Sequence, residues 1–144
     1  MFVKQLSVFI ENRKGRLEQV TEVLKEKKIN IVSLSLADTN EYGLLRMIVS
    51  DPDEAKNALK ENGFSAMLTD VLAIKLPHKI GMLQELLKLL SDADLNVEYM
   101  YALATGVENA SMIVKTSDPT KAYETIKAGD MEVFDPQMVY SING

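Results

Sequence analysis

The chain carries Gly15-Arg16-Leu17 followed by Ile29-Asn30-Ile31, and 66 positions later it carries Gly81-Met82-Leu83 followed by Leu95-Asn96-Val97. A fixed offset between matched segments is the signature of a duplicated structural unit. We therefore predict that the 144 residues contain two copies of one unit.

A helix start is repeated as well. Asp51-Pro52 corresponds to Asp118-Pro119 at an offset of 67, after one inserted residue. Aspartate suits the N-cap, and proline suits the first helical position because its missing N–H has no partner there anyway. A helix is therefore expected after each pair. Asp135-Pro136 resembles both, so we expect a short helix in the tail, with a strand through Tyr140 and Ile142 as the alternative.

The spacing of apolar residues gives the same order of elements in both halves. Alternating apolar residues predict strands, and apolar residues three and four apart predict helices. Strands are expected at residues 6–10, 29–37, 44–49, 64–68, 71–76, 95–103, 110–114 and 131–134. Helices are expected at residues 15–28 and 81–93 and after each Asp-Pro pair. Each half thus reads strand, helix, strand, strand, helix, strand.

This order is typical of the ferredoxin-like βαββαβ fold, an α+β unit whose antiparallel sheet carries both helices on one face. We place the first unit at residues 1–69 and the second at residues 70–144. Only Thr69-Asp70 separate the last strand of the first unit from the first strand of the second, and no Gly/Ser/Pro-rich linker intervenes. We therefore predict a tandem repeat whose halves form one rigid body about a pseudo-twofold axis.

Composition limits the classes of function. Hydrophobic residues make up 47% of the chain and charged residues 26%, as in folded globular proteins. No apolar run approaches the ~20 residues of a membrane span, and the N-terminus lacks the apolar core of a signal peptide. The absence of cysteine and the single histidine, His78, disfavour metal sites, and the net charge of −5 disfavours nucleic-acid binding. We expect a soluble, cytoplasmic protein without a cofactor, bound neither to membranes nor to nucleic acids.

The loop before the first helix of each half is the candidate site. It reads Glu11-Asn-Arg-Lys-Gly-Arg-Leu17 in the first half and Pro77-His-Lys-Ile-Gly-Met-Leu83 in the second. Glycine lets the backbone approach a ligand closely, and the free amides of a helix N-terminus donate to an anion such as a carboxylate. Arg13, Lys14 and Arg16 oppose the helix dipole, which a bound carboxylate would compensate. Ordinary solvated surface charge is the alternative interpretation of these side chains.

Gly-x-Leu at a strand–helix junction, with Ile/Leu-Asn-Ile/Val opening the next strand, resembles the ACT domain. That family consists of small regulatory modules that often bind amino acids and are attached to, or associated with, metabolic enzymes. The resemblance covers nearly the whole chain, once per half, and implies a stand-alone tandem ACT protein. The family usually has a proline just before the glycine, where this chain has Lys14 and Ile80.

The resemblance also implies a ligand site where two modules meet, with the first loop of one module facing the second strand of the other. One set of ligand-binding residues is then Asn12, Arg13, Gly15 and Leu17 with Asn96 and Val97. The other set is His78, Ile80, Gly81 and Leu83 with Asn30 and Ile31. Backbone groups would hold the α-amino and α-carboxylate groups, and side chains would select the ligand.

Several neighbouring residues have two interpretations. Tyr99, Met100 and Tyr101 alternate between faces, so one tyrosine face either lines a pocket or packs as in an ordinary strand. His78 either contacts a ligand or is an exposed loop residue, and no Ser/Asp constellation indicates catalysis. The leucines of residues 86–90 make one helix apolar over a wide arc, which suggests contact with the other half or with another chain.

Three functions remain open from the sequence. The favoured one is a non-catalytic protein that binds an amino acid or a similar small metabolite and regulates a metabolic enzyme, with a homodimer as the expected assembly. The second is a protein–protein assembly module without a ligand. The third is a small enzyme such as an acylphosphatase-like hydrolase, for which Asn12 and Arg13 are the only candidate residues.

Overall fold

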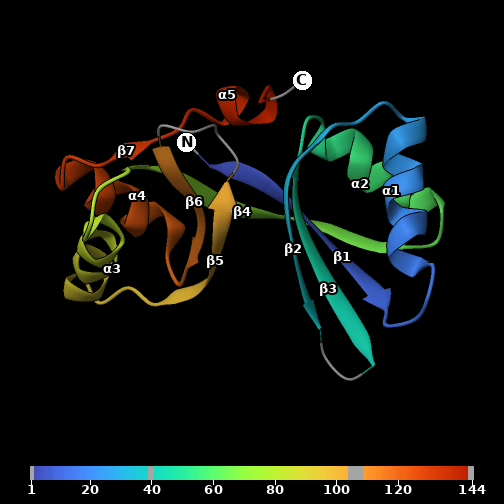
Figure 1. Ribbon diagram of the computed structural model, residues 1–144, viewed down its shortest axis with the longest axis horizontal. Coiled ribbons are helices and arrows are strands. Elements are labelled where there is room, and N and C mark those ends of the chain that lie inside the picture. The colour runs from blue at the N-terminus through green and yellow to red at the C-terminus, as the bar shows by residue number, and fades with distance from the viewer. Residues whose placement is uncertain (1, 39–40, 104–108, 143–144) are drawn as a thin grey trace. The chain divides into compact units, whose positions relative to one another are not determined.

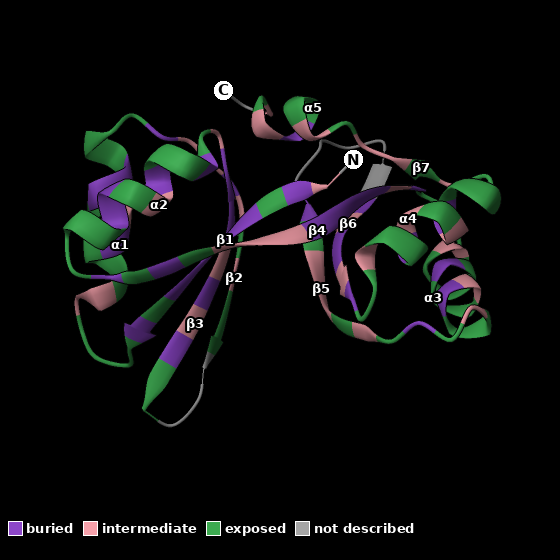
Figure 2. Ribbon diagram, turned by 180° about the vertical axis from the view of Figure 1, so that it is seen from behind, coloured by how far each residue is buried: buried purple, intermediate pink, exposed green. Residues whose placement is uncertain are grey.

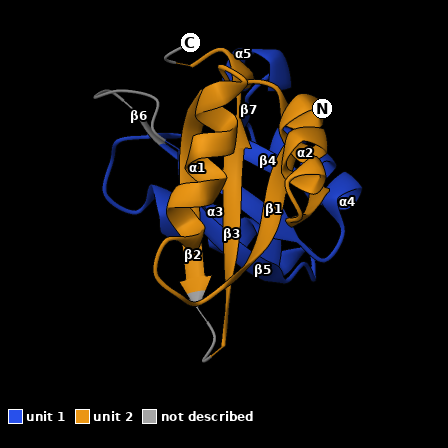
Figure 3. Ribbon diagram, turned by 90° about the vertical axis from the view of Figure 1, so that its right-hand side faces the viewer, with its two compact units in different colours: residues 1–3, 70–139 blue, residues 4–69, 140–144 orange. Residues whose placement is uncertain are grey.

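The computed structural model describes residues 2–38, 41–103 and 109–142. The chain divides into two compact units (Figure 3). The N-terminal unit, unit 2 in the figure, holds residues 4–69 and the end of the chain from Tyr140. The C-terminal unit, unit 1 in the figure, holds residues 70–139 and residues 1–3. Each unit therefore includes a short terminal segment of the chain in addition to its own half of the sequence.

The N-terminal unit is a sheet with both helices on one face (Figure 1). Its elements are β1 (Val3–Glu11), α1 (Arg16–Glu26), β2 (Ile31–Asp38), β3 (Tyr42–Val49), α2 (Pro52–Glu61) and the first part of β4 (Ser65–Pro77). The strands lie in the order β2-β3-β1-β4, and β3 pairs antiparallel with both β1 and β2. This is the strand order of the ferredoxin-like fold.

The core of the N-terminal unit lies between this sheet and its helices. Because successive side chains of a strand point to opposite faces, every second residue of β1 and β3 is directed beneath the helices. Leu6, Val8, Leu45 and Met47 are fully buried there, and Leu59 of α2 packs against them. Both helices accordingly show a buried stripe and an exposed stripe (Figure 2).

The C-terminal unit repeats the arrangement. Its elements are the rest of β4, α3 (Met82–Asp92), β5 (Val97–Leu103), β6 (Asn109–Thr116), α4 (Pro119–Ala128) and β7 (Glu132–Val133). β7 pairs with β4, β4 with β6, and β6 with β5, all antiparallel. Leu72, Ile74, Leu86, Leu90 and Ile126 are fully buried in its core. The α+β class and the ferredoxin-like order are thus confirmed in both units, whereas the pseudo-twofold relation stays a prediction.

β4 differs from the sequence prediction of two strands at residues 64–68 and 71–76. The structure has a single strand of 13 residues from Ser65 to Pro77. Thr69-Asp70 contains neither glycine nor proline, so nothing in the local sequence interrupts the extended backbone. The strand ends at Pro77, where the missing N–H cannot contribute to a ladder.

The Asp-Pro helix starts are confirmed. Asp51 Oδ1 accepts a hydrogen bond from the Glu54 amide at 3.2 Å, and Asp118 Oδ1 accepts one from the Lys121 amide at 3.1 Å. Proline occupies the first helical turn of both α2 and α4. These two helices therefore have one of their free N-terminal amides satisfied by a side chain.

The tail of the chain is helical rather than extended. α5 (Pro136–Tyr140) follows Asp135, whose Oδ1 accepts from the Gln137 amide at 2.9 Å.

Among residues 2–38, 41–103 and 109–142, no helix is long and apolar enough to cross a bilayer.

Two neighbouring leucines of α3 test this packing. Leu86 is fully buried, whereas Leu87 is 36% exposed. Leu86→Ala should lower the free energy of unfolding by about 2–5 kcal/mol, since it removes apolar contacts and leaves a cavity. Leu87→Ala, the matched control, should cost clearly less in a urea titration. Equal losses would show that Leu87 is covered in solution and that its side of α3 is not a free surface.

Candidate functional site

Both candidate loops turn on a left-handed glycine. Gly15 has φ +89° and Gly81 has φ +88°, and each is the N-cap of the helix that follows. A Cβ at either position would meet no atom within 4 Å. Glycine is thus required by the backbone conformation, which disfavours L side chains, and the space beside it stays open to a ligand.

The helices that begin at these glycines have no side-chain cap. This holds for α1 and for α3, in contrast to α2 and α4 with their aspartates. The amides of a first helical turn have no partner within the helix, and they carry the positive end of its dipole. The Arg16 and Met82 amides donate to the Arg13 and Lys79 carbonyls at 3.3 and 3.4 Å. The amides that follow, at Leu17 and Leu83, are therefore the donors that suit an anionic group such as a carboxylate.

The side chains of the N-terminal loop are exposed. Arg13 Nε lies 3.1 Å from Glu11 Oε2, and both side chains are more than half exposed. The Asn12 amide donates to the Glu41 carbonyl at 3.0 Å, which holds the loop against the start of β3. Leu17, on the first turn of α1, is 38% exposed. The predicted residues of this loop therefore share one accessible region at the start of α1.

The C-terminal loop is less charged. His78, Ile80 and Gly81 are exposed, with Ile80 fully so, and Leu83 of α3 is 44% exposed. In the described ranges no three His, Cys, Asp or Glu side chains are grouped so as to hold a metal ion. The loop thus combines a helix start without a side-chain cap with apolar neighbours and one exposed lysine, Lys79.

Asn30 and Asn96 are held by a pair of serines that the sequence analysis missed. The Asn30 amide donates to Ser50 Oγ at 2.9 Å, and the Ser50 amide donates back to the Asn30 carbonyl at 2.9 Å. Asn96 and Ser117 make the same two bonds at 3.2 and 3.0 Å. The signal was present, because a serine precedes Asp-Pro in both copies. The two serines fix the backbone at the entry of β2 and β5.

The end of the chain engages one of these asparagines. Asn30 Nδ2 donates to the Ile142 carbonyl at 3.0 Å, and the Lys4 amide donates to the Tyr140 hydroxyl at 2.7 Å. Both contacts belong to the N-terminal unit. Asn96, the counterpart of Asn30, is exposed. The two copies therefore present different surroundings at the predicted second-strand position.

Each predicted set combines the loop of one unit with the second-strand entry of the other, and a loop and a second strand of the same unit cannot replace it. The glycine lies at the start of α1 and Asn30-Ile31 beyond its end, and the 11 residues of α1 span about 16 Å. Asn96-Val97 stands beyond α3 in the same way. A complete set therefore needs a first loop and a second strand from different modules, and that assembly stays a prediction.

The tyrosines of β5 lie on the sheet face away from the core. Tyr101 pairs with Ile113 and Tyr99 with Lys115, while Met100 pairs with Val114 and packs against the core cluster. Met100 is thus the member of this trio that shares the helix-covered side of the sheet.

The geometry agrees with one known family. The family model of the ACT domain pair matches residues 1–141. The chain belongs to the ACT domain pair family. The resemblance based on the two Gly-x-Leu motifs is therefore confirmed, and each ferredoxin-like unit is one ACT domain of the pair.

Solved structures share this fold. Protein BT0572 from Bacteroides thetaiotaomicron is 40% identical, with a TM-score of 0.93 over 98% of this chain and 97% of that one. The regulatory subunit of aspartate kinase from Thermus thermophilus, in a ligand-free form, is 16% identical, with a TM-score of 0.64 over 87% of this chain and 90% of that one. The corresponding subunit from Thermus flavus is 17% identical, with a TM-score of 0.61 over 88% and 92%. No curated protein matches the chain.

The backbone at the first ACT glycine can be tested by substitution. Gly15→Ala should lower the free energy of unfolding by about 1–2 kcal/mol, because alanine is strained at positive φ. Gly15→Asn should cost less, since asparagine tolerates this conformation better. Urea unfolding of both variants measures the difference. Wild-type stability in Gly15→Ala would mean that the loop relaxes out of the left-handed conformation.

Proposed function

We propose that this ACT domain pair is a non-catalytic regulatory protein that binds an amino acid or a similar small metabolite at its glycine loops. The observation that carries the proposal is the contrast between the helices. α1 and α3 begin on left-handed glycines without a side-chain cap, whereas α2 and α4 are capped by Asp51 and Asp118. Uncapped amides beside open space suit a ligand carboxylate.

In this proposal each ligand contacts two modules. The amides after Gly15 or Gly81 hold the α-carboxylate, and the second strand of another ACT module supplies the remaining contacts. One site comprises Asn12, Arg13, Gly15 and Leu17 with Asn96 and Val97. The other comprises His78, Ile80, Gly81 and Leu83 with Asn30 and Ile31. The facing modules belong to one chain or to two copies of it.

Arg13 fits a role in attracting the ligand. Its ion pair with Glu11 is exposed to solvent, and such pairs contribute little because water and salt screen them. Exchange of Glu11 for a ligand carboxylate is therefore inexpensive in free energy. An acylphosphatase-like hydrolase is the weaker alternative, since Asn12 and Arg13 are its only candidate residues.

The regulated partner in this proposal is a metabolic enzyme. The aspartate kinase regulatory subunits share the fold at a TM-score above 0.6, and a regulatory subunit is the role that their names give. A ligand that binds one arrangement of the modules better than another shifts the equilibrium between them, which an associated enzyme senses.

The proposal includes a homodimer, which is supported by exposed leucines on the edge strand β2. Leu34 and Leu36 of β2 are about half exposed, although they pair with Met47 and Leu45 on the core side of the sheet. β2 is the last strand of the order on that side, and an exposed apolar edge favours pairing with another chain. The same observation supports the assembly-module alternative, which requires no ligand.

The test is a thermal-shift panel of the twenty amino acids at millimolar concentration, followed by calorimetry on any hit. A ligand at 100 times its Kd stabilises the folded state by about 2.7 kcal/mol, which raises Tm by several degrees in a protein of this size. We expect one chemical class of amino acid to raise Tm. The Gly15→Val and Gly81→Val variants should each weaken that shift.

Gly63 supplies the matched control. It has φ +84° and open space around its Cβ position, as Gly15 has, but it follows α2 and lies outside the candidate loops. Gly63→Val should therefore lower the Tm of the free protein yet keep the ligand-induced shift. The proposal fails if no amino acid raises Tm in a folded sample, or if the shift survives in the Gly15→Val, Gly81→Val double variant.

A further inference from the structure

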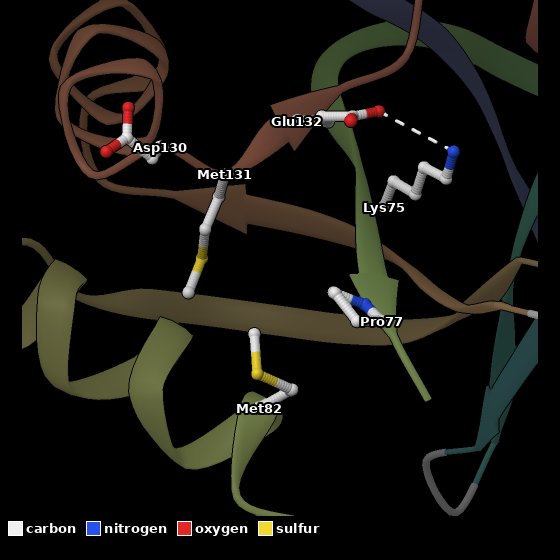
Figure 4. A pocket seen from close by; sticks show the side chains of 6 residues that line it. All are labelled: Lys75, Pro77, Met82, Asp130, Met131 and Glu132. Carbon is white, nitrogen blue, oxygen red and sulfur yellow. Dashed lines mark ion pairs between the residues drawn. The ribbon is translucent and has the colours of Figure 1, made fainter. Parts of the chain in front are cut away.

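The C-terminal unit contains a small pocket away from the proposed second-strand contacts. It measures about 120 Å³ and is lined by Lys75, Pro77, Met82, Asp130, Met131 and Glu132. Figure 4 shows the side chains of Met82 and Met131 pointing toward one another, one from the start of α3 and one from the segment before β7. Two polarizable thioethers thus form part of the wall.

The pocket exists because β7 is short. Its pairing with β4 consists of Ile74 with Val133 and Lys75 with Glu132. Beyond that point Met131 and Asp130 diverge from Pro77. Proline has no N–H, and its carbonyl accepts from the Lys79 amide at 2.8 Å. At the pocket, the edge of β4 therefore presents the apolar ring of Pro77 instead of a main-chain N–H donor.

An ion pair stands at the mouth of the pocket. Lys75 Nζ lies 3.6 Å from Glu132 Oε2, and the two side chains are 38% and 74% exposed. The dashed line in Figure 4 marks this pair beside the thioether wall. At this distance and exposure the pair is weak, so both charged groups are available to a ligand that offers the opposite arrangement of charges.

The other unit carries a different pair of side chains at the equivalent positions, and that pair borders a more open cavity of about 270 Å³. At the repeat offsets, Met82 corresponds to Arg16 and Met131 to Phe64. The Arg16 guanidinium lies 4.5 Å from the centre of the Phe64 ring, which is a cation–π contact. In the C-terminal unit this stacked pair is replaced by two flexible methionines, and the pocket lies between them.

We propose that this pocket is a second ligand site, which takes the side chain of a small aliphatic α-amino acid while Lys75 and Glu132 hold its carboxylate and ammonium groups. The volume suits this ligand, because an apolar cavity of ~150 Å³ holds a six-carbon ring and leucine or methionine adds four heavy atoms beyond Cα. A zwitterion places opposite charges next to one another and so complements an ion pair. The pocket borders the C-terminal glycine loop through Pro77 and Met82, but Lys75, Asp130, Met131 and Glu132 lie outside the residues proposed for the glycine-loop site.

Methyl NMR of the full chain labelled with [methyl-13C]methionine tests the pocket, with L-leucine as the probe. The Met131 and Met82 methyl resonances should shift and saturate, whereas those of Met67 and Met138, which are more than half exposed and do not line the pocket, should stay in place. Met131 is the deciding reporter because, unlike Met82, it belongs to neither glycine loop. A Met131 resonance that does not move overturns the proposal, whatever happens at the glycine loops.

Two comparisons test the chemistry of the mouth. Lys75→Gln should weaken leucine binding at Met131 about tenfold through loss of a charged hydrogen-bond donor, while Lys79→Gln, an exposed lysine that does not line the pocket, should leave it unchanged. 4-Methylpentanoate and isoamylamine carry the same side chain with one charge each, and both should bind more weakly than leucine. Equal binding of either compound, or an unaffected Lys75→Gln variant, would overturn the zwitterion assignment.

A filling variant separates this site from the glycine loops. Met82→Arg with Met131→Phe copies the stacked pair of the N-terminal unit and should abolish leucine binding at this site in calorimetry. The Gly15→Val variant should leave the Met131 shift intact. Loss of the Met131 shift in Gly15→Val would contradict a distinct pocket. So would a folded filling variant that binds leucine with the same heat as the wild-type protein.

Discussion

The left-handed backbone at Gly15 and Gly81 sets the direction in which the first helix of each ACT domain leaves its sheet. At φ near +89° a side chain would crowd the backbone, so a glycine is favoured at both junctions. This conformation lets the helix begin without a capping side chain. The amides that follow the first helical residue, at Leu17 and Leu83, and the positive end of the dipole thus remain for an anionic partner. The proposed ligand chemistry depends on this one backbone constraint.

The two ACT domains keep the same backbone devices and differ in side chains. Gly63 and Asp130 both take left-handed conformations after the second helix, as Lys28 and Asp94 do after the first. The serine contacts at Asn30 and Asn96 are likewise repeated. Despite these shared backbone features, the side chain of Asn30 donates to the Ile142 carbonyl, whereas that of Asn96 is exposed. A duplicated fold has thus acquired two chemically different surfaces, which fits different binding roles for the two halves.

Local features of the sequence predicted most of the fold. Asp-Pro pairs marked α2, α4 and α5 because capping is a local interaction, and alternation located β1 and β2. The prediction divided β4 at Thr69-Asp70 because the repeat places the change of unit there, although these two residues do not interrupt the strand. It also missed which unit each terminus joins, since the contact of Asn30 with Ile142 links positions 112 residues apart.

The candidate site was predictable only in part. The glycine loops follow from the repeated motif, but the serine contacts of Asn30 and Asn96 join residues 20 and 21 positions apart and depend on tertiary geometry. The thioether pocket depends on where the short strand β7 stops pairing. Neither composition nor periodicity reports such a termination, because it reflects the packing of side chains distant in sequence.

The most direct test of the central claim is an amide 15N NMR titration with the amino acid that gives the largest thermal shift. The account predicts the largest changes at the first-turn amides of α1 and α3, at Leu17 and Leu83. The capped first turns of α2 and α4, read at Glu54 and Lys121, serve as internal controls and should change little. Binding that leaves Leu17 and Leu83 unperturbed, or that moves the capped turns equally, would contradict the assignment of the glycine loops as the ligand site.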